Sequence, residues 1–166
     1  MLITSLCFVT FAFVLLHSLG YRINRSASLP FLIYKIEPLV KEQEIRHGAH
    51  VIIDLPMLSN PVISLGVERG YVNLREPMLK QIGAVPGDTV VLTDGFLHVT
   101  GEINKKSEIT VASHDSLGGE LFAWPTPITL QAGQYWLISD PERGFDSRYF
   151  GPISRSAFTH RARPVF

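Results

Sequence analysis

The sequence predicts a mainly β protein, an antiparallel β-fold behind one N-terminal transmembrane helix. From residue 29 onward, short apolar runs are bounded by Gly, Pro, Asp and Asn, and no long stretch repeats with the period of a helix. Before them, residues 2–19 contain no charged side chain. We therefore expect a membrane anchor or signal segment over residues 1–20. The remainder, residues 21–166, is long enough for one domain with its own core.

The N-terminal apolar run favours a retained anchor. As a helix, residues 2–19 would cover about 27 Å, which is just enough to cross a bilayer. A cleaved signal peptide is the alternative, but its apolar core usually has only about 7 to 15 residues and follows a basic start. This run is longer, and no Lys or Arg precedes it.

The domain is expected to form an antiparallel β-meander. The dipeptide Asp94-Gly95 suits a tight hairpin turn that needs positive φ. The predicted strands are Phe31–Ile36, Ala49–Leu55, Leu79–Val85, Thr89–Leu92, Phe96–Thr100 and Tyr135–Ser139.

Little else in the chain has a regular pattern. One weak helix is expected within Ile63–Glu76, where Gly66 and Gly70 interrupt the helical period. The segment Lys105–Pro127 is polar and then rich in Gly and Pro, so we interpret it as a surface excursion.

Composition excludes several classes of function. The 15 basic residues equal the 15 acidic ones, so no electrostatic footprint for nucleic acid exists. Cys7 is the only cysteine, which rules out an intramolecular disulfide and a cysteine metal cluster. His47 and His50 stand at a spacing that sends strand side chains to opposite faces. No metal and no cofactor are expected.

Two residues could perform nucleophilic chemistry together. Ser28 follows the apolar run, and a serine hydroxyl needs a neighbouring base to become a nucleophile at neutral pH. Lys80 lies in an apolar strand, where it would share a face with Met78 and Ile82. Burial there would lower the pKa of the amine until it can act as that base. The plainer alternatives are a linker serine and an edge-strand lysine that blocks aggregation.

Three ordered segments make the catalytic interpretation more specific. They are Ser-Leu-Pro at residues 28–30, Leu-Lys-Gln-Ile-Gly-Ala-Val-Pro-Gly-Asp at 79–88, and Ser-Asp-Pro-Glu-Arg-Gly-Phe-Asp-Ser-Arg-Tyr-Phe-Gly-Pro-Ile at 139–153. Behind one anchor, they resemble the type I signal peptidases, above all the TraF-like serine peptidases that mature pilin precursors in conjugative transfer. The resemblance extends from the anchor to Pro164.

The resemblance implies a role for each matching residue. Ser28 matches the nucleophile and Lys80 the general base, and the oxyanion hole is implied to use the Ser28 backbone N–H with the hydroxyl of Ser26. The residues implied to support the site structurally are Asp140, Asp146, Ser147 and Arg148.

The sequence departs from the family pattern at two positions. Many members have a serine two residues before the aspartate of the Asp-Ser-Arg box, where its hydroxyl helps to hold the lysine, but this chain has Gly144. Ser139 stands where glycine is usual. Another group, such as a water or a nearby hydroxyl, must therefore orient Lys80.

The expected function is that of a membrane-anchored serine endopeptidase with a Ser/Lys dyad. It would cleave signal peptides from exported proteins or process pilin-type precursors, so its partner would be an exported precursor. We expect a shallow apolar pocket that accepts small residues before the cut. We expect a single span in the bacterial inner membrane and the catalytic domain, residues 21–166, on the periplasmic side. Arg22 and Arg25 argue for the opposite orientation, but this excess of positive charge is small.

Several alternatives remain open from sequence. The acyl-enzyme could be resolved by an amine, which would make the protein a peptide cyclase or transferase. A non-catalytic envelope scaffold of a secretion or conjugation apparatus is supported by Gly144 but opposed by the intact Ser28 and Lys80. A self-cleaving repressor would need a DNA-binding segment where the anchor lies, and no Ser-His-Asp triad stands in a nucleophile-elbow context.

Overall fold

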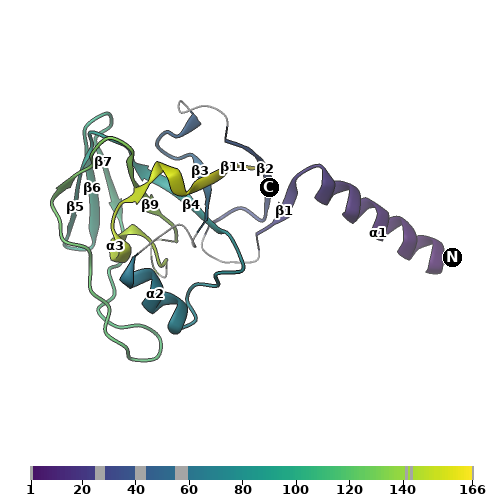
Figure 1. The fold of residues 1–166 in the computed structure, drawn as a ribbon, viewed down its shortest axis with the longest axis horizontal. Helices are drawn as coiled ribbons and strands as arrows, with labels where there is room; N and C mark the ends of the chain where they lie inside the picture. The colour runs from purple at the N-terminus through teal and green to yellow at the C-terminus, as the bar shows by residue number, and fades with distance from the viewer. Residues whose placement is uncertain are drawn as a thin grey trace.

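Two antiparallel sheets form the body of the protein, and one helix extends away from them (Figure 1). The computed structural model describes residues 2–24, 29–39, 44–54, 60–140, 142 and 144–165. Within these ranges the chain is mainly β, as the sequence predicts.

The larger sheet has seven strands in the order β1-β2-β11-β3-β4-β9-β10, with every neighbouring pair antiparallel. The C-terminal strand β11 lies between β2 and β3, so this sheet is not the expected meander. The strands are β1 (Tyr21–Ile23), β2 (Ile33–Pro38), β3 (His50–Ile53), β4 (Met78–Ala84), β9 (Gln134–Ile138), β10 (Ile153–Ser154) and β11 (Phe158–Pro164).

The smaller sheet has four strands in the order β7-β6-β5-β8. The predicted hairpin is confirmed: β5 (Thr89–Thr93) and β6 (Phe96–Thr100) pair around Asp94 and Gly95, whose φ angles are 47° and 77°. Strand β7 (Lys105–Glu108) corrects the prediction that residues 105–127 form a surface excursion, and β8 (Ile128–Thr129) follows directly after that segment. β7 is an edge strand of mostly exposed polar residues, so it has no apolar alternation to reveal it.

Capping residues fix the short helices. Helix α2 (Pro61–Glu68) begins at Asn60, whose Oδ1 accepts the Val62 N–H at 2.9 Å. It ends well before the predicted Glu76, because Gly70 turns the chain with a φ of 75°. The four-residue helix α3 (Ser147–Phe150) is capped by Asp146, and a 3₁₀ turn, η3 (Arg155–Ala157), precedes β11.

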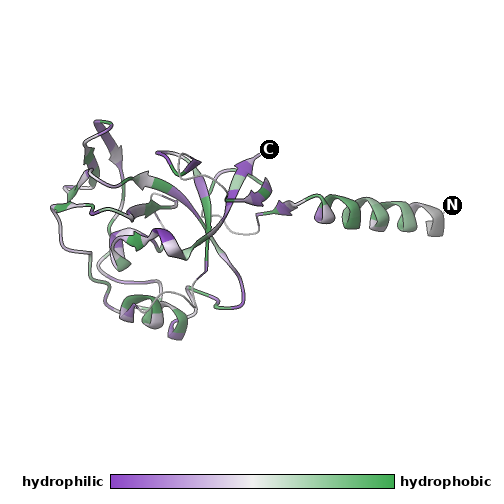
Figure 2. Ribbon diagram, turned by 45° about the horizontal axis from the view of Figure 1, so that its top comes forward, coloured by the Kyte–Doolittle hydropathy of each residue, from purple (hydrophilic) through white to green (hydrophobic). Residues whose placement is uncertain are grey.

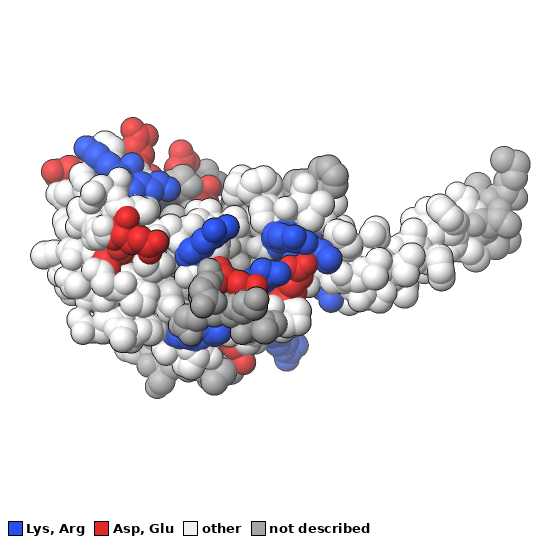
Figure 3. All heavy atoms as spheres, turned by 90° about the horizontal axis from the view of Figure 1, so that it is seen from above, with Lys and Arg blue, Asp and Glu red and all other residues white. Residues whose placement is uncertain are grey.

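Helix α1 (Leu2–Ser18) has 17 residues and exposes its apolar side chains away from the sheets (Figure 2). It ends where Gly20 adopts a φ of 88°. Among the described residues, no helix combines the length and the apolar character that crossing a bilayer requires, so the predicted transmembrane span is not confirmed. Figure 3 shows charges of both signs on the domain and none along α1.

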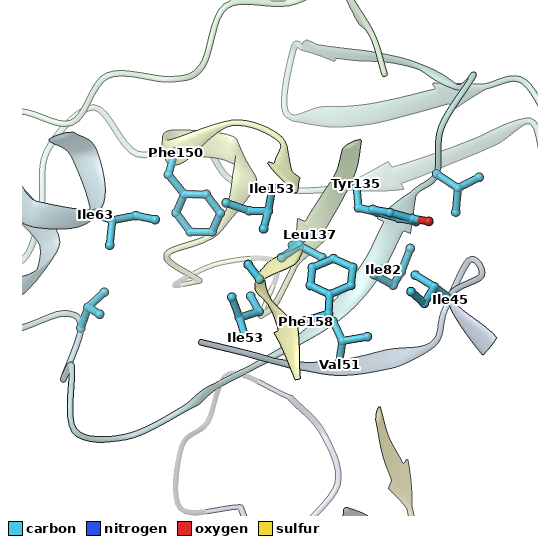
Figure 4. Close-up of a cluster of buried hydrophobic side chains, with 13 residues drawn as sticks. Ile45, Val51, Ile53, Ile63, Ile82, Tyr135, Leu137, Phe150, Ile153 and Phe158 are labelled. Atoms are coloured by element: carbon cyan, nitrogen blue, oxygen red, sulfur yellow. The ribbon is translucent and has the colours of Figure 1, made fainter. Parts of the chain in front are cut away.

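The largest apolar cluster lies on one face of the seven-stranded sheet and holds β4 in the interior (Figure 4). Val51, Ile82 and Leu137, from three adjacent strands, are essentially inaccessible to solvent there. A second cluster packs the four-stranded sheet around Trp136. Side chains of β4 that point toward the largest apolar cluster are therefore removed from water.

Candidate active site

Lys80 is buried in the middle of the seven-stranded sheet. It lies in β4 between β3 and β9, opposite Val51 of β3, and is only 4% exposed. By strand alternation its side chain shares a face with Met78 and Ile82, as the sequence predicts. The edge-strand alternative is wrong, because β4 is paired on both sides.

Burial lowers the pKa of the Lys80 amine from its ordinary value of 10.5 to about 8. Desolvation is the largest cause, because the charged ammonium loses its water. Asp146 raises this pKa and Arg148 lowers it, so the two charges oppose each other. A substantial fraction of the amine is therefore neutral, and able to accept a proton, in mildly alkaline solution.

Asp146 and Arg148 form a fully buried ion pair next to this lysine. The guanidinium donates from Nε to Oδ1 and from Nη2 to Oδ2, each at 2.8 Å, which is a bidentate arrangement. Arg148 also donates to the backbone carbonyls of Thr110, Asp140 and Gly144. The pair thus joins the start of α3 to two separate loops.

The other residues implied to support the site gather around the same pair. The Asp140 carboxylate accepts the Glu142 N–H at 2.9 Å, which shapes the turn after β9. The Ser147 hydroxyl accepts the Leu137 N–H at 2.9 Å. Ser139 donates to Asp146 Oδ2 from both its backbone N–H and its hydroxyl, each at 2.8 Å.

Gly144 is enclosed by this network. A Cβ at this position would lie 2.5 Å from Arg148 Nη2 and 2.6 Å from the Asp140 carbonyl oxygen, and would overlap the Ser139 hydroxyl. A serine at residue 144 therefore does not fit this arrangement.

The two serines expected at the reaction centre, Ser26 and Ser28, lie outside the described residues. The described chain resumes at Leu29, which is buried with Tyr34 and Ile52 in a third apolar cluster. Leu79, the residue before Lys80, packs against that cluster from the opposite face of β4.

An open groove passes Lys80 and is lined by Ile53, Met78, Tyr71 and Phe145 among others. Charged and polar residues, including Arg75, Glu76 and His160, also line it. The rings of Tyr71 and Phe145 lie 5.7 Å apart, centroid to centroid.

Part of the groove wall comes from residues 105–127, the segment for which the sequence predicts no helix or strand. The Asp115 carboxylate accepts hydrogen bonds from the Tyr71 hydroxyl and from Arg69 Nη1 at 2.9 Å. The hydrogen bond from Tyr71 is the largest cause that lowers the pKa of this carboxyl to about 2, and the N–H groups of Gly119 and Leu117 and the charge of Arg69 lower it further. The local sequence pattern did not single out Asp115, because its partners Arg69 and Tyr71 lie more than 40 positions away.

Comparison with known proteins identifies the class to which this chain belongs. The family model described as "Signal peptidase, peptidase S26" matches residues 1–166, so the chain is a member of the signal peptidase S26 family. The resemblance deduced from sequence is thereby confirmed.

Individual relatives are named as conjugal or plasmid transfer proteins. A "Conjugal transfer protein TraF" of Agrobacterium tumefaciens is 29% identical over 89% of this chain and 82% of its own length. A "Plasmid transfer protein TraF" of Escherichia coli is 31% identical over 90% and 84%. A signal peptidase I structure from Enterococcus faecalis matches 73% of this chain and 95% of its own, with 19% identity and a TM-score of 0.40.

Asp146→Asn should destabilise the protein by about 3 to 5 kcal/mol, because it leaves the Arg148 guanidinium buried without a counter-charge. Urea denaturation followed by circular dichroism measures this change. Arg163→Gln, which breaks the ion pair between the exposed Arg163 and Glu37, should cost less than about 1 kcal/mol. Equal effects of the two substitutions would contradict the structural importance of the buried pair.

Lys80→Met should stabilise the protein at pH 7, because it removes a buried ammonium. Lowering a pKa from 10.5 to about 8 corresponds to about 3 kcal/mol. Between these pH values the unfolded state binds more protons than the folded state, so wild-type stability rises with pH and the advantage of the variant shrinks. Urea denaturation at pH 7, 8.5 and 10 tests this.

Lys105→Met is the matched control, since Lys105 is exposed in β7. It should change the free energy of unfolding by less than about 0.5 kcal/mol. A Lys80→Met advantage that stays constant from pH 7 to 10 would contradict the lowered pKa.

Proposed function

We propose that this protein is a serine endopeptidase in which Ser28 is the nucleophile and Lys80 the general base. Its substrates would be exported precursors, either signal peptides or pilin-type precursors of a conjugative transfer system. One observation carries the proposal: Lys80 is a buried amine whose pKa falls to about 8, and no described residue forms an ion pair or hydrogen bond with it. The lone pair of the neutral amine is therefore available to accept a proton from a nucleophile.

The proposed reaction has two halves. First, neutral Lys80 Nζ takes the proton of Ser28 Oγ as that oxygen attacks the scissile carbonyl carbon. The resulting oxyanion is stabilised by the Ser28 backbone N–H and the Ser26 hydroxyl. The C–N bond then breaks, the Lys80 ammonium returns its proton to the leaving amine, and an ester to Ser28 remains.

In the second half, Lys80 takes a proton from a water molecule that attacks the ester. The ester bond breaks, Ser28 Oγ recovers its proton from Lys80, and the new carboxyl end of the product leaves. An amine in place of this water would produce a cyclised or transferred peptide. Mass spectrometry separates the two outcomes, because a cyclised product is lighter by one water than the linear one.

The buried ion pair has a supporting role in this proposal. Asp146 alone would raise the pKa of Lys80 and keep the amine protonated, but Arg148 opposes it. Because the guanidinium already occupies both carboxylate oxygens, Lys80 does not need to serve as the counter-charge of Asp146. The lysine can thus remain a base.

We further propose that α1 associates the protein with the bacterial inner membrane and that the domain lies on the periplasmic side. Support comes from the exposed apolar side chains of α1, including Leu6, Phe8 and Phe11. A precursor whose own apolar segment lies in the same membrane would then be presented beside the groove. Membrane flotation and protease protection of spheroplasts would test both statements.

The feature that suggested a non-catalytic scaffold also has an explanation in packing. Gly144 was the feature that suggested a retired enzyme, yet the space that a side chain would need there is already occupied by Ser139 and Arg148. The glycine is therefore required by packing.

Ser28→Ala and Lys80→Ala should each reduce precursor processing to background, while the protein stays folded. Processing is measured by electrophoresis of a co-expressed pilin-type precursor. A serine-reactive acylating probe should label the wild type but not Ser28→Ala. Ser113→Ala and Lys105→Ala, which alter exposed residues, should retain full activity. Normal processing by either dyad variant would disprove the mechanism.

The rate of processing should rise with pH through about 8 and level off above it. Only the neutral amine can accept the serine proton, and the pKa of Lys80 is about 8. Single-turnover rates between pH 6 and 10 measure the midpoint. A rate that is independent of pH across this range would exclude Lys80 as the base.

A further inference from the structure

We propose that residues 110–124 form a fixed arm that binds the precursor along the groove, with Asp115 as the residue that holds this arm in place. The inference rests on the proposed function and concerns the binding of the substrate, not the chemical step. Figure 1 shows the arm in green beside α2, and Asp115 contacts Arg69 at the end of that helix.

Both ends of the arm are fastened to Arg148, the buried arginine of the site. At the first end, Arg148 Nη1 donates to the Thr110 carbonyl at 2.6 Å. At the other end, the Trp124 N–H donates to the Arg148 carbonyl, also at 2.6 Å. Between them, the Ala112 N–H donates to the Tyr149 hydroxyl at 3.0 Å. The arm therefore leaves the centre of the site and returns to it, as an Ω-loop does.

The middle of the arm is a tight turn that the Asp115 carboxylate organises. Its Oδ1 accepts the N–H groups of Leu117 at 2.7 Å and Gly119 at 2.9 Å. The Asp115 N–H donates to the Gly119 carbonyl at 2.8 Å, and an antiparallel bridge pairs His114 with Glu120. Oδ1 thus gives the arm its internal shape.

The second oxygen of the same carboxylate joins this turn to the segment that follows α2. Asp115 Oδ2 accepts from the Tyr71 hydroxyl and from Arg69 Nη1, the latter at 2.9 Å. Arg69 also donates to the Glu120 carbonyl at 3.0 Å. Glycine is required at residue 119, because a Cβ there would lie 2.5 Å from Asp115 Oδ2 and 2.7 Å from Arg69 Nη1. The Asp115 side chain is consequently only 4% exposed.

The two segments that Asp115 joins both line the groove that passes Lys80. Residues 70–78 supply one part of the lining. The arm supplies another part, which consists of Ala112, His114, Asp115, Ser116 and Leu121. A precursor that occupies the groove beside Lys80 therefore meets a surface whose position depends on Asp115.

The physical consequence is a lower entropic cost of binding. A loop that becomes ordered only when the substrate binds loses conformational entropy at that moment, which weakens affinity. Here the arm is already fastened, at Arg148 and at Asp115. The Asp115–Tyr71 contact does not titrate near neutral pH, because the pKa of Asp115 is about 2 and burial and this carboxylate raise the pKa of Tyr71. Asp115 acts through the arm, so it is a positioning residue.

The first test compares Asp115→Asn with Tyr71→Phe in the full chain, in detergent micelles, with a pilin-type precursor as substrate. Each substitution should raise KM about 10-fold and change kcat less than about twofold, because the arm then becomes ordered only on binding. The two effects should not add in the double variant, since both break the same hydrogen bond. The midpoint of the pH–rate profile should stay at the wild-type value, because Lys80 is unchanged.

Asp94→Asn is the matched control. Asp94 is exposed in the β5–β6 turn, and asparagine tolerates its positive φ. This variant should match the wild type in both KM and kcat. A fall in kcat at unchanged KM in Asp115→Asn would overturn the role of the arm in binding.

A second readout does not depend on peptidase activity. Lys80→Met should bind a fluorescein-labelled peptide that spans the cleavage site of the precursor, and adding Asp115→Asn should weaken this binding about 10-fold, as fluorescence anisotropy measures. Hydrogen exchange at residues 115–119 should also become faster. Absence of binding by Lys80→Met, or an equal Kd in the folded double variant, would overturn the inference. Full processing by Ser28→Ala together with Asp115-dependent binding would contradict the proposed chemistry and leave the arm supported.

Discussion

The buried ion pair between Asp146 and Arg148 is the interaction on which the rest of the site depends. Neither side chain is accessible to water, and isolated charges at this depth would cost several kcal/mol each. The cost is offset because every carboxylate oxygen is bonded and because the guanidinium reaches three backbone carbonyls in two separate loops. The pair therefore fixes the relative positions of β9, α3 and the loop through Thr110.

This closed pair determines what Lys80 can be. A buried lysine beside an unpaired aspartate would form the ion pair itself and remain an ammonium. Here Arg148 already neutralises Asp146, and the desolvated amine has a pKa near 8. The protein thus retains a destabilising group in the centre of its main sheet, a stability cost that proteins often carry at functional positions. The pKa of Lys80 is thus set by the arrangement of the charged groups around it and by burial, and not by any single contact.

Much of the fold could be predicted from local pattern. The hairpin at Asp94 and Gly95 and the apolar strand around Lys80 were visible because turn chemistry and β-runs act over a few residues. β7 was missed because an exposed edge strand does not need apolar alternation. The position of β11 between β2 and β3 could not be predicted, since pairing over more than 100 residues leaves no local trace.

The sequence by itself determined the family, the candidate dyad of Ser28 and Lys80, and the Asp-Ser-Arg box, because these depend on residue types in a fixed order. Only the tertiary structure decided that Lys80 is interior and that residue 144 has no space for a side chain beside Arg148 and Asp140. Both facts arise from strand register and from atoms that compete for the same space, which are properties of packed neighbours and are absent from the order of residues along the chain.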